Sequence, residues 1–268
     1  MDRDLDGYAD RVYIPDTGGQ LWRVDIADSS LANWTVELLA SIDGSAPAGS
    51  RKFLYPPDVV YGRDATGPYD AVLIGSGDRE HPFDTTVTNR FYMFKDRKTG
   101  SSGAGQATIT EADLFDATSN VLQTASGTAL TSAQNALSAA KGWMITLATG
   151  EKVVGGAVTV SGVTYFNTNQ PSSVAPAGAC SNLGVARAYG VGFADATAAG
   201  ALASGQTVTL ASRYTVVPGG GYLPSPVSVV LEINGKLVQG VISGTYVQTP
   251  PSAQLNWRYR VYWRIQHD

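Results

Sequence analysis

The sequence has little sulfur, little histidine and little net charge, and each shortage excludes a class of protein. Among its 268 residues Cys180 is the one cysteine, so the chain holds no internal disulfide and no cysteine-based zinc cluster. The two histidines, His81 and His267, disfavour a multi-histidine metal site. A formal net charge of −4 and a pI near 5.2 argue against a nucleic-acid-binding surface.

Long apolar runs are missing as well. No stretch has the length and hydrophobicity needed to cross a bilayer, and no signal-peptide pattern is present. We therefore expect no direct membrane span. The chain is either intracellular or a part of a longer secreted protein, and composition does not choose between the two.

The residues that are abundant favour a β protein. Hydrophobic residues make up 43% of the chain, charged residues 16%, and there are 30 glycines and 13 prolines. Short alternating segments separated by Gly, Pro, Asn or Asp follow one another, and Asn234-Gly235 is the strongest hairpin signal. Strands are expected within residues 11–26, 58–78, 90–96, 142–148, 151–168, 186–193 and 228–243.

The end of the chain shows the clearest alternation. In NWRYRVYWRIQ, residues 256–266, apolar and polar side chains alternate with a period of two, which is typical of a half-buried strand. We expect the arginines there to lie on a solvated or ion-paired sheet face. The apolar face comprises Trp257, Tyr259, Val261, Trp263 and Ile265.

Helix is expected only in the middle of the chain. Leu130, Ala133, Leu137 and Ala140 are spaced as on one helix face, and Gly142 ends the pattern. Residues 100–141 read as an insertion, with one more short helical turn near TEADLFD. The strand pairs lack a strict repeat, and they fit either irregular propeller blades of about 40–50 residues or a sandwich.

The chain opens with four aspartates in MDRDLDGYADR. Asp2, Asp4, Asp6, Tyr8 and Asp10 occupy the ligand positions of an EF-hand-type calcium loop, with glycine at the sharp turn. Alternate carboxylates, joined by the Tyr8 carbonyl, can converge on one ion. Without a cation, each close carboxylate pair would repel by about 1–4 kcal/mol.

The loop departs from an EF-hand in one respect. Tyr13 stands where the bidentate glutamate would be, and a strand rather than a helix is expected to follow. The spacing thus predicts a nine-residue Ca²⁺ loop that leads into a β-hairpin. The alternative is a solvated acidic turn.

Several motifs in order carry a family resemblance. DRDLDGYADRVYIPDTGGQLWRVDI is followed by VLIGSGDREHP, NRFYMFKD, GWMITLATGEKVV and RVYWRIQ. Together they resemble the C-terminal domain of the PilC/PilY-type pilus-tip proteins of type IV pili. The likeness spans nearly the whole chain and is weakest over residues 100–141.

The resemblance implies a modified β-propeller, or the C-terminal portion of one, with calcium held by Asp2, Asp4, Asp6, the Tyr8 carbonyl and Asp10. It implies a non-enzymatic pilus biogenesis and adhesin module that regulates pilus extension and retraction. The implied partners are minor pilins at the pilus tip and a host or abiotic surface. The implied location is the cell surface, at the pilus tip or outer membrane, after secretion.

Two features limit which properties of the family can be expected for this chain. Family members are longer and their propeller begins before the loop, so residues 1–268 are expected to be a C-terminal domain fragment. Gly62-Arg63-Asp64 differs in order from the Arg-Gly-Asp tripeptide of some members, so integrin binding is not implied.

Other candidate sites favour structural roles. Asp78, Glu80 and His81 in GSGDREHP could form a general base with an acidic partner, but a salt-bridge loop centred on Arg79 is the better interpretation. Cys180 is expected to have no role. The tryptophans are expected to pack rather than to stack sugars, and they are Trp22, Trp34, Trp143, Trp257 and Trp263.

Two other functions remain as alternatives. GGQLWRVDI resembles blades of quinoprotein-type propeller dehydrogenases, although ligands within one local loop leave little room for a quinone cofactor. A carbohydrate-binding β-sandwich with a structural calcium is the other alternative.

Overall fold

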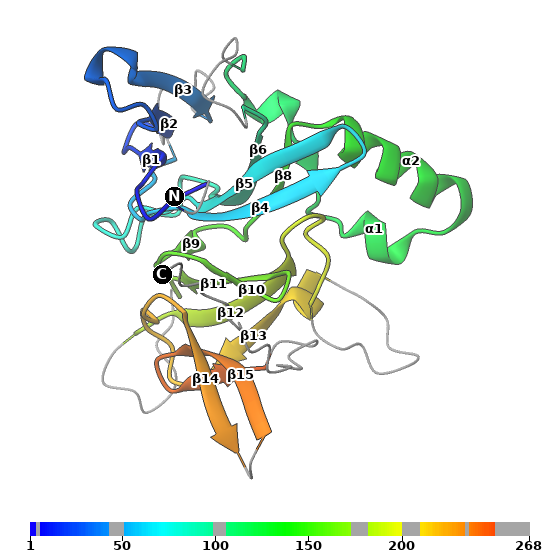
Figure 1. Ribbon diagram of the computed structural model, residues 1–268. Coiled ribbons are helices and arrows are strands. Elements are labelled where there is room, and N and C mark those ends of the chain that lie inside the picture. Colours follow the sequence, from blue (N-terminus) through cyan, green and yellow to red (C-terminus); the bar gives the residue numbers. More distant parts are fainter. Residues whose placement is uncertain are drawn as a thin grey trace.

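The computed structural model describes residues 1–3, 6–42, 51–98, 106–172, 182–199, 210–233 and 236–249. These residues form four sheets and few helices (Figure 1). The prediction of a mostly β chain with a small helical insertion is therefore confirmed. The predicted strand within 256–266, Cys180 and His267 lie outside the described residues.

The first sheet is an antiparallel meander in the order β1-β2-β3. Asp16 makes the first turn, because its Oδ1 accepts hydrogen bonds from the backbone amides of Gly18 and Gln20, each at 2.9 Å. The strand β3 was not expected from the sequence. The elements are β1 (Arg11–Pro15), β2 (Gln20–Asp25), the 3₁₀ turn η1 (Leu31–Asn33) and β3 (Thr35–Ser41).

The second sheet has the order β4-β5-β6-β8-β7, and all its pairs are antiparallel except β7 with β8. The strand β6 has the bounds that alternation predicts for RFYMFKD. The strands are β4 (Asp58–Asp64), β5 (Gly67–Gly75), β6 (Arg90–Asp96), β7 (Phe115–Asp116) and β8 (Gly142–Thr146).

The predicted insertion lies between two neighbouring strands of this sheet, β6 and β8. Its described part contains η2 (Glu111–Asp113), α1 (Val121–Thr124) and α2 (Gly127–Ala139). The Lys95 ammonium donates to the carbonyls of Leu137 and Ala140, at 3.3 and 3.2 Å, which satisfies the C-terminal end of α2. No helix in the described ranges could cross a membrane.

The third and fourth sheets follow in chain order. The third has the order β10-β11-β12-β13 with β9 also paired to β11, and the fourth has the order β14-β15-β16. Ile233 pairs with Lys236, so the hairpin predicted around Asn234-Gly235 is confirmed by its two strands. The elements are β9 (Lys152–Val153), β10 (Val158–Val160), β11 (Val163–Gln170), β12 (Val185–Gly192), η3 (Leu210–Arg213), β13 (Tyr214–Val217), β14 (Val227–Ile233), β15 (Lys236–Ser243) and β16 (Tyr246–Gln248).

The second sheet is buried on both faces. Tyr92 and Phe94 of β6 pack with residues of the first sheet, whereas Phe91 and Met93 pack toward the third. The rings of Phe91 and Phe166 stack with centroids 3.8 Å apart and join the second and third sheets. Val241 of β15 packs with Tyr165 of β11, so each sheet packs against its neighbour in the chain.

The first sheet buries two charged side chains and exposes several apolar ones. Arg11 of β1 and Arg23 of β2 are 3% and 1% exposed and face the second sheet. Val12, Ile14 and Val36 on the opposite face are 39%, 48% and 65% exposed. Strand alternation is therefore present, but the inward face combines Arg11 and Arg23 with buried apolar side chains such as Leu21, and several apolar side chains lie on the outward face.

Gly142 and Gly67 both have positive φ, but only Gly142 has a neighbouring atom that a side chain would clash with. Gly142 begins β8 with φ +152°, and a Cβ there would lie 2.0 Å from the Met93 carbonyl oxygen. Gly67 has φ +128° and open space around it.

Gly67→Ala should cost about 1–3 kcal/mol of unfolding free energy from backbone strain. Gly142→Ala should cost about 1–3 kcal/mol more from the clash with β6. Urea denaturation of both variants checks this, and equal losses would contradict it.

Candidate functional site

The aspartate loop is closed by its own first residue. The Met1 carbonyl oxygen accepts hydrogen bonds from the amides of Asp10, at 2.9 Å, and Arg11, at 3.2 Å. The Met1 amino group donates to the Arg11 carbonyl at 2.8 Å. The loop therefore begins and ends at one point, directly before β1.

Within the loop the carboxylates accept hydrogen bonds from backbone amides. Asp2 Oδ2 accepts from Gly7 N at 3.0 Å, and Asp6 Oδ1 accepts from Tyr8 N at 2.8 Å. Gly7 has φ +97°, which is the sharp turn that the spacing predicts. The Tyr8 side chain is 77% exposed, so the loop faces solvent.

Four of the five predicted ligand residues lie in this short loop, but the structure does not gather the carboxylates of Asp2, Asp6 and Asp10 into one group, and Asp4 lies outside the described part. The set offers only oxygen donors, and such donors suit a hard cation such as Ca²⁺. In the described ranges no three acidic, histidine or cysteine side chains are gathered closely enough to hold a metal ion.

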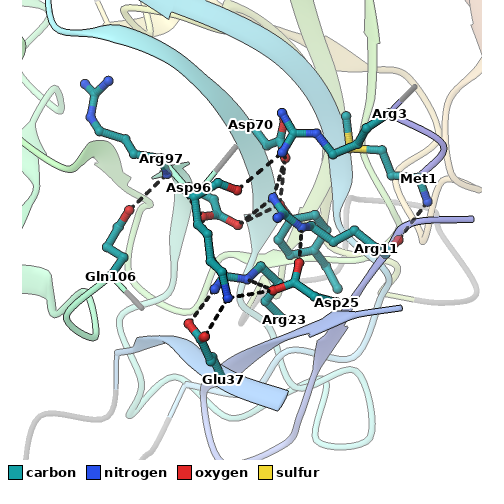
Figure 2. A network of polar contacts seen from close by, with 12 residues as sticks. Met1, Arg3, Arg11, Arg23, Asp25, Glu37, Asp70, Asp96, Arg97 and Gln106 are labelled. Carbon is teal, nitrogen blue, oxygen red and sulfur yellow. Dashed lines mark hydrogen bonds and ion pairs between the residues drawn. The ribbon is translucent and has the colours of Figure 1, made fainter. Parts of the chain in front are cut away.

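A buried network of charged side chains lies directly beneath the loop (Figure 2). Arg11 Nη1 lies 2.9 Å from Asp70 Oδ2 and 3.4 Å from Asp96 Oδ2. Arg23 Nη1 donates to Asp96 Oδ1 at 2.7 Å. Both guanidinium groups also pair with Asp25 of β2. Because Asp70 and Asp96 belong to β5 and β6, the network joins the first sheet to the second.

The network is balanced in charge. Besides Arg11 and Arg23, its cations are Arg3 and Lys98, and besides Asp25, Asp70 and Asp96, its carboxylates include Glu37. Four cations thus meet four carboxylates. A buried charge is tolerated only when it is compensated in this way.

Burial and neighbouring charges fix the protonation states in the network. Burial raises the pKa of Asp70 despite the nearby Arg3 and Arg11. Burial also raises the pKa of Tyr13, and the two carboxylates beside it raise the pKa further. Tyr13 therefore stays neutral, and its hydroxyl donates toward Asp96 and Asp70, with O···O distances of 2.8 and 3.1 Å.

Arg3 connects the loop to this network. Its backbone amide donates to Asp10 Oδ2 at 2.5 Å, and its guanidinium lies 3.2 Å from Asp70 Oδ2. The same guanidinium donates to the Lys98 carbonyl at 3.3 Å. With Arg11 directly after Asp10, the loop has two cationic contacts with buried carboxylates. The order of the loop is therefore linked to the interface between the two sheets.

The fold of the chain is similar to that of a solved structure. The fold is similar to that of the PilY1 C-terminal domain. The crystal structure of that domain from Pseudomonas aeruginosa matches with a TM-score of 0.66 and 17% sequence identity over 93% of this chain. The chain spans 59% of the length of that domain. Neither a protein-family profile nor a curated protein sequence matches.

The GSGDREHP segment of this PilY1-like chain is organised differently from our expectation. Asp78, and not Arg79, is the centre of its ion pairs, because Asp78 Oδ2 lies 2.6 Å from Lys52 Nζ and 2.9 Å from His81 Nδ1. Arg79 instead donates to the Tyr55 hydroxyl at 3.3 Å. Arg79 is unsuited to the centre because it extends outward, whereas Asp78 faces a polar cavity of about 330 Å³.

The tryptophans of the PilY1-like fold have different environments. Trp143 is fully buried, and its indole N–H donates to the Phe193 carbonyl at 2.9 Å. Trp22 is half-buried and donates to Asp16 at 3.0 Å. Trp34 is 44% exposed, so the expectation of packing is wrong for this residue. Trp257 and Trp263 lie outside the described ranges.

Sequence reasoning missed the charge network, although a signal for it exists. Asp70 directly precedes the apolar run AVLIG, and Asp96 follows the run FYMF after one lysine, so each carboxylate belongs to a strand that is buried on both faces. An acidic residue in such a place needs a buried cation. Arg11 and Arg23 in RVYIPDTGGQLWRVD are those cations, and Asp25 at its end is a further partner of both.

We expect Asp96→Asn to destabilise the protein by about 3–5 kcal/mol, because two buried guanidinium groups would lose a shared carboxylate. The shape of the side chain is retained, so packing alone would predict a small change. Asp28→Asn, which changes an exposed turn carboxylate outside the network, should stay close to wild type. Urea denaturation measures both, and equal stability of the two variants would contradict the prediction.

Asp78 should contribute a pH-dependent part of the stability. Burial alone would raise the pKa of Asp78, but the hydrogen bonds of Lys52 and His81 lower it to about 2. Because the pKa is lower in the folded than in the unfolded chain, this stabilisation is present above about pH 4 and is lost as the pH falls toward 2. Wild type should exceed Asp78→Asn in stability at pH 5, and the gap should close by pH 2. A gap that is constant across this range, measured by urea denaturation, would be the contrary result.

Proposed function

We propose that this chain is a calcium-binding, non-enzymatic module of a type IV pilus tip, of the PilC/PilY type. The observation that carries the proposal is the PilY1-like fold over 93% of the chain. The motif order from the aspartate loop to GWMITLATGEKVV supports the same assignment. We further propose secretion to the cell surface, minor pilins as partners, and a role in pilus extension, retraction and surface attachment.

The sheet arrangement supports a modified β-propeller within this proposal. Propeller blades are antiparallel meanders that pack face to face in chain order. The four sheets of three to five strands follow that order, and each packs against the next along the chain. We propose that they correspond to blades of such a propeller.

Calcium would be held by Asp2, Asp4, Asp6, the Tyr8 carbonyl and Asp10. The closed loop keeps these oxygen donors within a short span of chain, and the bound ion would offset the repulsion among the carboxylates. Arg3 would then connect the ordered loop to Asp70. Through this contact, calcium would favour one arrangement of the interface between the first two sheets.

Titration calorimetry tests the metal site. Wild type should bind one Ca²⁺ with a Kd between about 1 μM and 1 mM, which is the range of sensor and extracellular oxygen-ligand sites. Asp4→Ala and Asp10→Ala should each weaken binding at least about tenfold, because each removes a proposed ligand. Glu80→Ala removes one negative charge outside the loop and should leave the Kd unchanged. The absence of binding by wild type at millimolar calcium would refute the metal site.

The partner role needs a separate measurement. The affinity for a minor-pilin complex should rise when calcium is present and fall when a chelator is added. The Asp10→Ala variant should show the low affinity in both conditions. A partner affinity that does not depend on calcium would contradict the regulatory role and leave the metal site untouched.

A further inference from the structure

A second concave surface lies away from the aspartate loop, where α2 meets the turn between β4 and β5. In Figure 1 the two helices lie at the right of the second sheet, and β1–β3 lie at the upper left. The cavity measures about 290 Å³ and is lined by residues of β4, β5, β6, both helices and the turn after β12. Binding pockets for small ligands begin near this size, at roughly 300 Å³.

The charged side chains in the floor of this groove already have partners within the chain. Lys95 is 3% exposed, and its ammonium group lies 3.2 Å from Asp64 Oδ2. It also donates to two carbonyls at the end of α2. Asp64 Oδ2 pairs with Arg97 as well, at 2.6 Å, and Tyr69 is 2% exposed. These side chains shape the groove but leave no free charge in its floor.

The rim, in contrast, carries polar groups without charge partners. Arg63 is exposed, and its side chain has no hydrogen bond or ion pair within the described part of the chain. Asp195 accepts two hydrogen bonds from Thr197, both at Oδ1, and forms no ion pair with the described residues. Gln134 and Ser138 of α2 complete the polar rim. One unpaired cation and one unpaired carboxylate therefore border the same cavity.

Apolar side chains line the same cavity as these polar groups. Leu122 of α1 and Leu137 of α2 are half-buried and line the groove. Nucleic acid would require a row of unpaired cations, and the lining offers Arg63 alone. A sugar would require an exposed aromatic face, and Tyr69 is buried. An aliphatic side chain with charged neighbours matches the lining best.

We infer that this groove binds a short peptide segment of a partner protein, in which an aliphatic side chain is flanked by an acidic and a basic residue. The aliphatic side chain packs against Leu122 and Leu137. The acidic side chain pairs with Arg63, and the basic side chain pairs with Asp195. This inference does not depend on the calcium loop or on its proposed function.

Phage display tests the inference. Peptides are selected from a library of random seven-residue sequences, with the full chain as bait. Enriched sequences should place Asp or Glu on one side of Leu, Ile or Val, and Lys or Arg on the other. The consensus peptide is then synthesised with a fluorophore and titrated by anisotropy. Failure to enrich any such sequence would overturn the inference.

Variants of exposed residues locate the bound peptide. Ser138→Trp fills the groove from the surface of α2 and should weaken binding at least about tenfold, which corresponds to about 1.4 kcal/mol. Ala136→Trp is the matched control, because two helical positions differ by about 200° and Ala136 points away from the groove. Equal binding by both variants would overturn the inference.

A charge swap tests the orientation. Arg63→Glu should weaken the consensus peptide at least about tenfold, and a peptide with Lys in place of its acidic residue should recover the affinity for this variant. A merely structural role of Arg63 would not reverse the charge preference. A preference for the acidic peptide that persists in Arg63→Glu would refute the assigned pairing.

Discussion

The pairing of Arg11 and Arg23 with the buried Asp70 and Asp96 is the interaction on which the rest of the architecture depends. A guanidinium group in a protein interior needs a carboxylate beside it, so the first sheet fits the second in one register. A shift of β1 by one residue would bury Val12 and expose Arg11, because side chains alternate along a strand. The buried carboxylates would then be left without their partners. The network thus specifies how the two sheets meet, in addition to any stability that it contributes.

This constraint also explains the environment of the second sheet. Its far face packs against the third sheet through apolar and aromatic side chains, as the stacked rings of Phe91 and Phe166 show. Its near face combines an apolar cluster with the charged network. Apolar packing is not directional, so it allows several ways for the two sheets to meet. The ion pairs require one relative position of the two sheets. Directional pairing on one face and close packing on the other together hold this sheet in the middle of the stack.

Strands and turns could be predicted from the sequence, because alternation and turn residues are local signals. The bounds of β6, the hairpin at Asn234-Gly235 and the helix before Gly142 are examples. The direction of each strand face could not be predicted, because a period of two does not say which side is inside. Arg11 and Arg23 face inward only because Asp70 and Asp96, distant in sequence, are there. The centre of the GSGDREHP ion pairs was missed for the same reason, since Lys52 comes from another segment.

The end of β6 shows how a single strand serves two sites. Asp96 and Lys98 point to the charge network, where they pair with residues of the first sheet. Lys95 and Arg97 point the other way and share Asp64 beside the groove. The loop contacts the segment directly after this strand, because the Arg3 guanidinium donates to the Lys98 carbonyl. Asp96 and Lys95 are thus adjacent residues whose side chains serve opposite sides of the sheet. Since Lys95 also donates to carbonyls at the end of α2, four consecutive residues, 95–98, contact both the charge network and the groove.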